Sequence, residues 1–482
     1  MTSLIRGLGR VGATILLIIV LALGAVGFLG WLHLFREVPE IVYESDRDHF
    51  NYASIGTENR EGMPYLIWAV LPELFKDKLE ANGSGQTGYA SFGMLEEPGR
   101  DTPIGITRKR IGFERQGINC AVCHTASFRT SPEAVREVVA AGPSVGFDSQ
   151  GYLRFLFACA RDPRFNADEL MPLIKQRTSL GPVEQALYRN LVIPQTKKAI
   201  LALADSYAWM DNRPTWGPGR IDPFNPVKFR MLGLPDDGTV GNSDMMPLWN
   251  EKAHVGFSYH WDGLERSLRE TIIEGALGDG ATLKSVNLEG LKRVESFINE
   301  AQPPSYPFPI DQARAAKGAT IFSASCAVCH APGGARTGTV IPLTEVGTDQ
   351  QRLLMWTQAA VDAYSAYADG YPYDFKNLQK TDGYVAVALD GLWLRGPYLH
   401  NGSVPNLEAL LTPPQDRPQV FIRGYDVIDR QKVGFISSGK EAESQGWRYE
   451  VAIQGNGNQG HSYGTELSTD DRKSLLEYLK TL

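Results

Sequence analysis

The sequence predicts a mainly α-helical protein with extensive ordered loops, preceded by one apolar N-terminal helix. Hydrophobic residues make up 43% and charged residues 21% of the 482 positions, a balance typical of chains that fold around buried cores. The 49 glycines and 29 prolines indicate many ordered loops, and no series of strand-rich hairpins is evident. At roughly 100–200 residues per domain, the length predicts two or three domains.

The N-terminal helix is predicted from the uncharged stretch 11–32, which matches the roughly 20 apolar residues that cross a bilayer. Arg6 and Arg10 precede it, which places the N-terminus in the cytoplasm, and Trp31 and Arg36 follow as interfacial anchors. A cleaved signal peptide is the alternative, although its apolar core is shorter, roughly 7–15 residues. We expect a single-pass protein of the bacterial inner membrane, with the bulk of the chain in the periplasm.

Local composition predicts helical and loop segments along the rest of the chain. Residues 183–211 are rich in Ala and Leu at helical spacing, whereas the Pro-, Gly- and Asp-rich stretch 212–262 predicts a long structured loop. A second helical passage covers about 264–300, and the proline-rich segment 302–309 then breaks any helix. The predicted units are the anchor at 1–36, a first domain at 37–300 and a second domain at 301–482.

Two helix starts are marked in the second domain. Asp311 is placed to cap a helix that leads towards Cys326. Residues 468–471 form a capping-box pattern before a final helix that carries Leu475 and Leu479 on one side.

The charge balance excludes one class of partner. Lys plus Arg number 48 against 55 for Asp plus Glu, so the formal net charge is −7, and no basic run is present. Nucleic acid is therefore not an expected partner.

Four of the five cysteines form two copies of one motif, Cys120-Ala121-Val122-Cys123-His124 and Cys326-Ala327-Val328-Cys329-His330. This C-x-x-C-H pattern is the attachment site of c-type haem. Two thiols one turn apart can each form a thioether with a porphyrin vinyl group, and the adjacent histidine offers its imidazole to the iron. The sequence therefore predicts two covalently bound c-type haems, with His124 and His330 as iron ligands, in two cytochrome c-like domains.

Other interpretations of the cysteines fit less well. A zinc site needs further Cys or His at ligand spacing, and a redox dithiol does not explain a histidine after both pairs. Cys159 lies in an apolar helical run, where a free cysteine is an inert packing residue.

The sixth ligands decide which iron can react. For the second haem, His461 lies in a Gly-dense loop that lets the backbone approach a haem face, and we prefer it to Met355, which lies among apolar residues. This choice predicts a low-spin second haem with two histidines. For the first haem the candidates are His254, His260 and the pair 245–246, and if none binds, the first iron is five-coordinate and is the reaction site.

Together these motifs resemble the di-haem cytochrome c peroxidase and MauG-like superfamily, and within it the rubber oxygenase-like proteins. Besides the two haem motifs, the resemblance rests on Trp261-Asp262-Gly263 with Ser267-Leu268-Arg269-Glu270, on residues 395–403 with Leu407 and Glu408, on Gly117–Cys120 and on Gly460–Gly464. It covers the chain from about residue 50 to the end.

The resemblance implies roles for individual residues. Trp261 would lie between the haems and help an electron or hole to cross, with a core tryptophan as the alternative. The two motif histidines would be proximal ligands, and His461 would be the distal ligand of the second haem. Tyr398 and His400 would lie near the second haem and support it by hydrogen bonds.

Departures from the peroxidase pattern qualify the expected chemistry. Thr271 stands where the peroxidases have Gln, and the acid that usually follows in their pattern is missing. Glu270 and Glu274 are the remaining acid/base candidates. The alternative interpretation of both residues is a surface position in the first turn of a helix, without a catalytic role. The stretch 272–277 predicts an apolar pocket that suits O₂ and a hydrophobic substrate.

The leading functional hypothesis is a redox enzyme that activates O₂ or peroxide at the first haem and passes electrons through the second. Its expected partners are the small oxidant, an apolar organic substrate, a periplasmic or membrane electron donor, and the inner membrane. The alternatives are a non-catalytic di-haem electron carrier and a peroxidase that reduces H₂O₂.

Overall fold

The computed structural model describes residues 2–80, 86–371 and 378–482. Helices account for 45% and strands for 11% of the chain, so the fold is mixed α/β with helices in the majority. The prediction of a mainly α fold is correct only in this coarser sense, because short paired strands build several of the expected loops.

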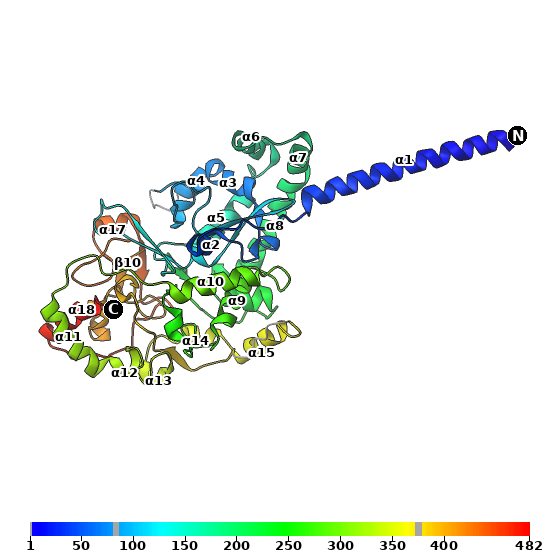
Figure 1. The fold of residues 1–482 in the computed structure, drawn as a ribbon. Coiled ribbons are helices and arrows are strands. Elements are labelled where there is room, and N and C mark those ends of the chain that lie inside the picture. The colour runs from blue at the N-terminus through cyan, green and yellow to red at the C-terminus, as the bar shows by residue number, and fades with distance from the viewer. Residues whose placement is uncertain (1, 81–85, 372–377) are drawn as a thin grey trace.

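Helix α1 (Thr2–Leu34) projects as a single rod from the body of the protein (Figure 1). Its part from Thr14 to Leu34 has a mean hydropathy of 2.7 and is, within the described residues, the one helix long and apolar enough to cross a membrane. The side chains of Arg6 and Arg10, on which the predicted orientation rests, lie outside the described part.

A three-stranded antiparallel sheet lies at the foot of α1 and leads into the first haem motif. Its strands are β1 (Met63–Pro64), β2 (Ile106–Ile111) and β3 (Phe113–Ile118), in the order β1-β3-β2. Gly112, with a φ of 74°, makes the tight turn between β2 and β3. The sequence analysis did not predict this hairpin.

Helices form most of the rest of the first half, and most of them pack around an apolar core of their own. They are α2 (Asp46–Tyr52), α3 (Tyr65–Leu74), α4 (Lys76–Glu80), α5 (Ser149–Arg161), α6 (Ala167–Arg177), α7 (Pro182–Leu187) and α8 (Ile193–Ser206). Phe50 and Tyr52, in α2, instead belong to the core shared with the second half. The predicted helix at 183–211 is present as α7, a π-helical turn at 188–192, α8 and a 3-10 turn at 208–212. The short pairs β4 (Thr125–Phe128) with β5 (Glu137–Ala140) and β6 (Arg220–Ile221) with β7 (Ser243–Asp244) complete this half.

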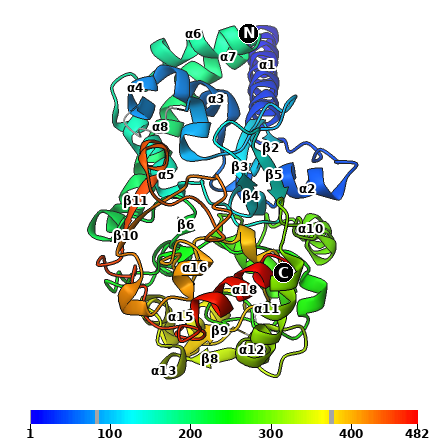
Figure 2. The same cartoon turned by 90° about the vertical axis from the view of Figure 1, so that its left-hand side faces the viewer.

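The later helices begin where the sequence predicted. After α9 (Leu268–Gly278) and α10 (Leu288–Glu300) the chain is irregular through the proline-rich segment. Asp311 caps α11 (Gln312–Ser325), and Ser468 caps α18 (Thr469–Leu479). These two helices lie side by side (Figure 2), and Gly318 makes the approach possible because a Cβ there would be 2.0 Å from the Ser474 carbonyl oxygen.

Short elements and loops form the remainder of the second half. The helices are α12 (Ala327–His330), α13 (Leu343–Val346), α14 (Gln351–Met355), α15 (Gln358–Tyr367), α16 (Leu407–Leu410) and α17 (Lys440–Gln445). The strand pairs are β8 (Val340–Pro342) with β9 (Gly383–Val385), and β10 (Val420–Arg423) with β11 (Trp447–Glu450).

One hydrophobic core crosses the predicted boundary at 302–309. It contains Trp249 and Leu291 from one side and Trp393 and Leu475 from the other. The Trp393 indole also donates to the carbonyl of Pro304 at 3.0 Å. The division into two haem domains stays a prediction, and the two halves share buried packing.

Candidate functional site

The first haem motif is held by the residue that precedes it. The Asn119 side chain accepts a hydrogen bond from the Ala121 amide at 3.0 Å and donates to the carbonyls of Phe50 and Ala53, at 3.0 and 2.9 Å. Strand β3 ends at Ile118, so the buried amide of Asn119 fixes the turn that carries Cys120 and Cys123 immediately after the sheet.

His124 is oriented as an iron ligand requires. Its Nδ1 lies 2.6 Å from the carbonyl oxygen of Met246, which can only accept, so Nδ1 carries the proton and Nε2 keeps its lone pair. Burial lowers the pKa of His124, which also favours the neutral imidazole. A backbone carbonyl thus fixes the tautomer and the direction of the ring.

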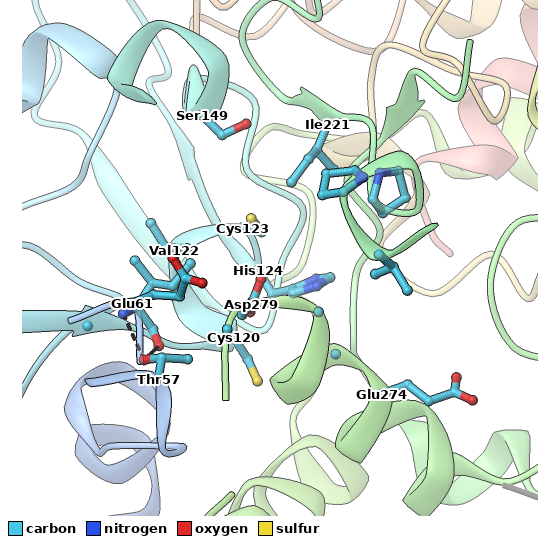
Figure 3. A pocket seen from close by; sticks show the side chains of 18 of the residues that line it. Thr57, Glu61, Cys120, Val122, Cys123, His124, Ser149, Ile221, Glu274 and Asp279 are labelled. Carbon is cyan, nitrogen blue, oxygen red and sulfur yellow. Dashed lines mark hydrogen bonds between the residues drawn. The ribbon is translucent and has the colours of Figure 1, made fainter. Parts of the chain in front are cut away.

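A large cavity adjoins this motif. It measures about 1390 Å³ and is lined by Cys120, Cys123 and His124, together with Trp261 and Glu274. Figure 3 shows Cys120, Cys123 and His124 near the centre of the view, with Thr57 and Glu61 to their left and Glu274 to their lower right. Single ligand pockets measure roughly 300–1,000 Å³, so this cavity has room for a haem and a further small molecule.

In the second motif, too, a backbone carbonyl orients the histidine. His330 ends the short helix α12, and its Nδ1 lies 2.8 Å from the Val387 carbonyl oxygen just after β9. Burial lowers its pKa as well. The second attachment histidine therefore also presents Nε2 as a free donor.

His461 faces His330 across a gap of the size of one ligated iron. The two ring centres are 6.2 Å apart. Two metal–imidazole bonds of about 2 Å, plus about 1 Å from each nitrogen to its ring centre, add up to about 6 Å. This spacing leaves room for one metal ion between the two imidazoles, which the predicted pairing of His330 with His461 requires.

The loop around His461 holds it in a strained but well-supported conformation. Its φ is 45°, its amide donates to the Val346 carbonyl at 2.7 Å, and its own carbonyl accepts from the Arg417 guanidinium at 3.0 Å. Burial, then the neighbouring His330 and Arg417, lower the pKa of His461 to about 4, so the ring is neutral and able to ligate. Met355, the alternative ligand, is 0% exposed and packs in the core.

The candidate sixth ligands of the first haem have other partners. His254 lies 3.1 Å from the Asp390 carboxylate and stacks on Phe257, and His260 lies 3.3 Å from the Glu274 carboxylate. Met245 is buried in the first-half core, and the Met246 carbonyl lies behind His124, on the side away from Nε2. All four candidates nevertheless line the same cavity as His124. In the described ranges, no second imidazole faces His124 as His461 faces His330.

Trp261 connects the two sites through short contacts. Its indole lines the first cavity and donates to the Asp244 carbonyl at 2.8 Å. Its own carbonyl accepts from the Val385 amide at 2.9 Å, two residues before the carbonyl that holds His330. Trp261 is thus joined by its backbone to the segment that holds His330.

The two candidate acids occupy different places. Glu274 lines the cavity and contacts His260, whereas Glu270, in the first turn of α9, is partly exposed and is not among the lining residues. Burial, and after it the charge of Glu274, raise the pKa of the neighbouring Glu265 to about 8. Burial raises the pKa of Asp279, another lining residue, to about 7. Sequence reasoning missed Glu265, Asp279 and the pairing of His260, because no motif marks them.

Comparison with known proteins adds one family match. The model of the RoxA-like, cytochrome c-like family matches residues 383–422. The uncharacterized protein y4iM of Sinorhizobium fredii (strain NBRC 101917 / NGR234) is 29% identical over 292 residues, which are 52% of this chain and 66% of the relative. The uncharacterized protein y4iJ of the same strain is 23% identical over 570 residues, which are 91% of this chain and 92% of the relative. A RoxA-like cytochrome c-like segment is thus present, which supports the rubber oxygenase-like branch of the resemblance and a haem-dependent redox protein.

The matched segment contains the scaffold of the second site. It begins with β9 and includes Val387, the hydrogen-bond partner of His330. Tyr398 donates to the Leu392 carbonyl at 3.0 Å, and His400 stacks on Tyr384 of β9 with ring centres 4.0 Å apart. Among the described residues, no hydrogen bond or ring contact joins Tyr398 or His400 directly to the second motif. Both contact other residues of the matched segment instead.

The donor sets fit c-type haem at both motifs. Each has two unpaired thiols and a neutral imidazole whose Nδ1 is already satisfied. The buried Nδ1 of His461 has no hydrogen-bond partner within the described residues, and its ring centre lies 6.2 Å from that of His330. Cys159 is fully buried and apart from both sites, in agreement with a packing role.

Proposed function

We propose that this protein is a redox enzyme with two covalently bound c-type haems. It is anchored in the membrane by a single span, and most of the chain lies in the periplasm. The first haem activates O₂ or peroxide, and the second exchanges electrons with a periplasmic or membrane donor. An apolar organic molecule is the second substrate of the first site. The RoxA-like segment and the apolar helix α1 support this assignment.

The observation that carries the proposal is the difference between the two histidine arrangements. His330 has His461 opposite it at 6.2 Å, whereas His124 faces the side chains of a large cavity. A haem iron with two histidine ligands can only pass electrons, and one with a free face can bind a small oxidant.

Each part of the chain has a defined task in this scheme. Cys120, Cys123 and His124 would hold the first haem, which supplies redox-active iron when bound. Leu268 and Ile272 of α9 give the cavity an apolar part beside Glu274, which limits water there, whereas Leu277 is buried in the core and does not line it. Trp261 and the Val385 backbone offer a short path towards His330.

A ligand-binding titration tests the proposal. The purified full chain should contain two haems, as measured by the pyridine haemochrome assay, and bind one equivalent of CO in the reduced state. Electron paramagnetic resonance should show one high-spin and one low-spin ferric centre. If both centres are low-spin and CO does not bind, the protein is an electron carrier and the enzyme assignment is wrong.

The contact between His260 and Glu274 favours peroxide reduction as a second candidate. Glu274 lines the cavity, and one of its buried oxygen atoms has no partner in the described part of the chain, so this carboxyl group can carry a proton between peroxide oxygens. Glu274→Gln should lower peroxide turnover by about 10²- to 10⁴-fold. Glu270→Gln is the matched control on the same helix, and equal turnover in both variants would exclude this role.

A further inference from the structure

We infer that the first haem's cavity takes up a long-chain fatty acid from the bilayer, through a mouth at the foot of α1, with the carboxylate at Arg115. This inference rests on the proposed function, in which α1 spans the membrane and the first site uses an apolar substrate. It adds the chemical class of the ligand, its route and its anchoring residue.

The mouth is built by the end of the membrane helix itself. Leu34 and Phe35 line the same cavity as His124, together with Phe113 of β3 and Leu191 of the turn before α8. Phe35 is 65% and Leu191 37% exposed, so these apolar side chains meet the surroundings at the point where α1 would leave the bilayer. An apolar chain can therefore pass from the lipid into the cavity without crossing water.

The foot of α1 is fastened to the β2–β3 hairpin. The Gly112 amide donates to the Arg36 carbonyl at 2.7 Å, and the Val38 amide donates to the Arg110 carbonyl at 3.0 Å. Lys109 pairs with Glu37 at 2.5 Å. These contacts keep the mouth at a fixed height relative to the membrane.

Helix α8 forms one wall of the passage. Gln195, Ala199, Ala202 and Leu203, at helical spacing, line the cavity. The small side chains of the two alanines leave space beside the helix. The cavity volume of about 1390 Å³ also exceeds roughly 1,000 Å³, the upper end of the range for a single ligand pocket. A chain can thus extend from the mouth towards the His124 side while the haem is in place.

Arg115 supplies the site for an anionic head group. It lies two residues beyond Phe113 on β3, lines the cavity and rests over the Phe113 ring at 5.0 Å. Its buried Nε has no hydrogen-bond partner, and no carboxylate among the described residues forms an ion pair with it. Arg230, which lines the same cavity, is neutralised by Glu61 at 2.9 Å. A partly buried cation without a counter-ion is costly, and a carboxylate from a ligand removes this cost.

Photo-crosslinking of the full chain in lipid nanodiscs tests the inference. The probe is a palmitic acid analogue with a diazirine in its chain, and labelled peptides are mapped by mass spectrometry. We expect labels on the mouth and on α8, and unlabelled palmitate should compete for them. The alcohol of the same length should bind about tenfold more weakly, because it cannot form the charge-assisted pair.

Two variants and their controls sharpen the result. Arg115→Gln should weaken palmitate binding about tenfold, and the exposed Arg110→Gln of the same hairpin should not. Leu191→Trp should block labelling of α8, and Val183→Trp, on an exposed position outside the cavity, should not. If Arg115→Gln instead removes or alters the first haem and leaves palmitate labelling unchanged, Arg115 serves a haem propionate and the inference is wrong.

A phospholipid probe and the comparison with CO binding distinguish a failure of this inference from a failure of the proposed function. A phospholipid with a diazirine acyl chain should label α1 alone; equal labelling of the cavity would overturn the assignment to a free carboxylate. One equivalent of bound CO without any palmitate labelling would overturn the inference and leave the proposed function intact. Palmitate labelling without CO binding would overturn the proposed function.

Discussion

His461 is the residue that distinguishes the surroundings of the two C-x-x-C-H motifs, because its ring faces His330. Its left-handed backbone, with a φ of 45°, is uncommon for a residue with a side chain, and it follows Gly460, whose Cβ would lie 2.3 Å from the Gly347 backbone. The tight contact between these two loops brings the ring opposite His330. The Gly-dense stretch in the sequence therefore marked a loop whose backbone comes close to its neighbours and brings His461 to His330.

Replacement of this ring should convert the second site into a reactive one. In His461→Ala the second iron loses its sixth ligand, so its spectrum should change from low-spin to high-spin. CO binding should rise from one to two equivalents per chain, while the haem content stays at two. Tyr463→Phe, a neighbour whose ring packs against His461, is the control. An unchanged low-spin signal in His461→Ala would mean that another residue is the ligand.

His254 should make stability depend on pH above neutrality. Burial alone would lower the pKa of His254, but hydrogen bonds to Asp390 and Glu251 outweigh it and raise the pKa to about 9. The folded pKa exceeds the unfolded value of about 6.5, so this stabilisation, on the order of 3 kcal/mol, is complete below pH 6.5 and is lost as the pH rises through 9.

The corresponding variant is His254→Gln. Its free energy of unfolding should be lower than that of the wild type by about 1–3 kcal/mol at pH 6, and the difference should shrink towards pH 9.5. Lys252→Gln, which removes the exposed ion pair with Glu300 on the same turn, should change stability by less than about 1 kcal/mol at any pH. A His254→Gln deficit that does not depend on pH would contradict the ion-pair explanation.

At the scale of elements, the β2–β3 hairpin determines whether the first haem motif can form. Gly105, at the start of β2, has a φ of 83°, and a Cβ there would lie 2.2 Å from the Val122 backbone nitrogen. Gly105→Ala should displace the turn that carries Cys120 and Cys123, so the haem content should fall from two to one per chain. Gly99→Ala, with a φ of 80° and open space around it, tests backbone strain alone and should keep both haems.

The same hairpin shows where sequence patterns fail. β2 and β3 carry charged residues, including Arg108, Lys109 and Glu114, so they lack the alternation of apolar and polar residues that marks a strand. Several of these charges are paired across the hairpin or with the foot of α1, for example Arg108 with Glu114 at 2.7 Å and Lys109 with Glu37, whereas Arg115 has no ion pair among the described residues. By contrast, Asp311 and Ser468 cap helices through local contacts, and local contacts can be predicted from sequence.

The functional residues also differ in whether a sequence pattern predicts them. The two C-x-x-C-H motifs are contiguous in sequence, so a haem-binding function could be predicted from them alone. The partners that orient those histidines, Met246 and Val387, act through backbone carbonyls, which any residue could supply. The contact of His260 with Glu274 depends on how α9 packs on the preceding loop, and no spacing rule reports that.

Across the whole molecule, buried ion pairs connect the two halves. Asp262, next to Trp261, pairs with Arg352 at 2.9 Å, and the two side chains are 1% and 2% exposed. Asp244, whose carbonyl holds the Trp261 indole, pairs with Arg423 at 2.5 Å. Together with the shared core, these pairs fix the tryptophan between the halves.

Loss of one of these cations should destabilise both halves at once. Arg352→Met leaves the buried Asp262 uncompensated and should cost about 3–5 kcal/mol of unfolding free energy. Arg448→Met, in an exposed pair, should cost less than about 1 kcal/mol. Calorimetry should show one shifted transition for the first variant, and two separate transitions would show that the halves unfold independently.

The carbonyl partners of His124 and His330 have a consequence for the redox chemistry of both irons. A carboxylate partner would gain and lose a proton, and the electron donation of the imidazole would change with it. A peptide carbonyl has no such titration, so neither ligand is tuned by the acidity of its surroundings. If both motifs hold haem as proposed, the proximal side of each would stay constant when the surrounding pH varies, and any pH dependence of the potentials would come from the opposite faces.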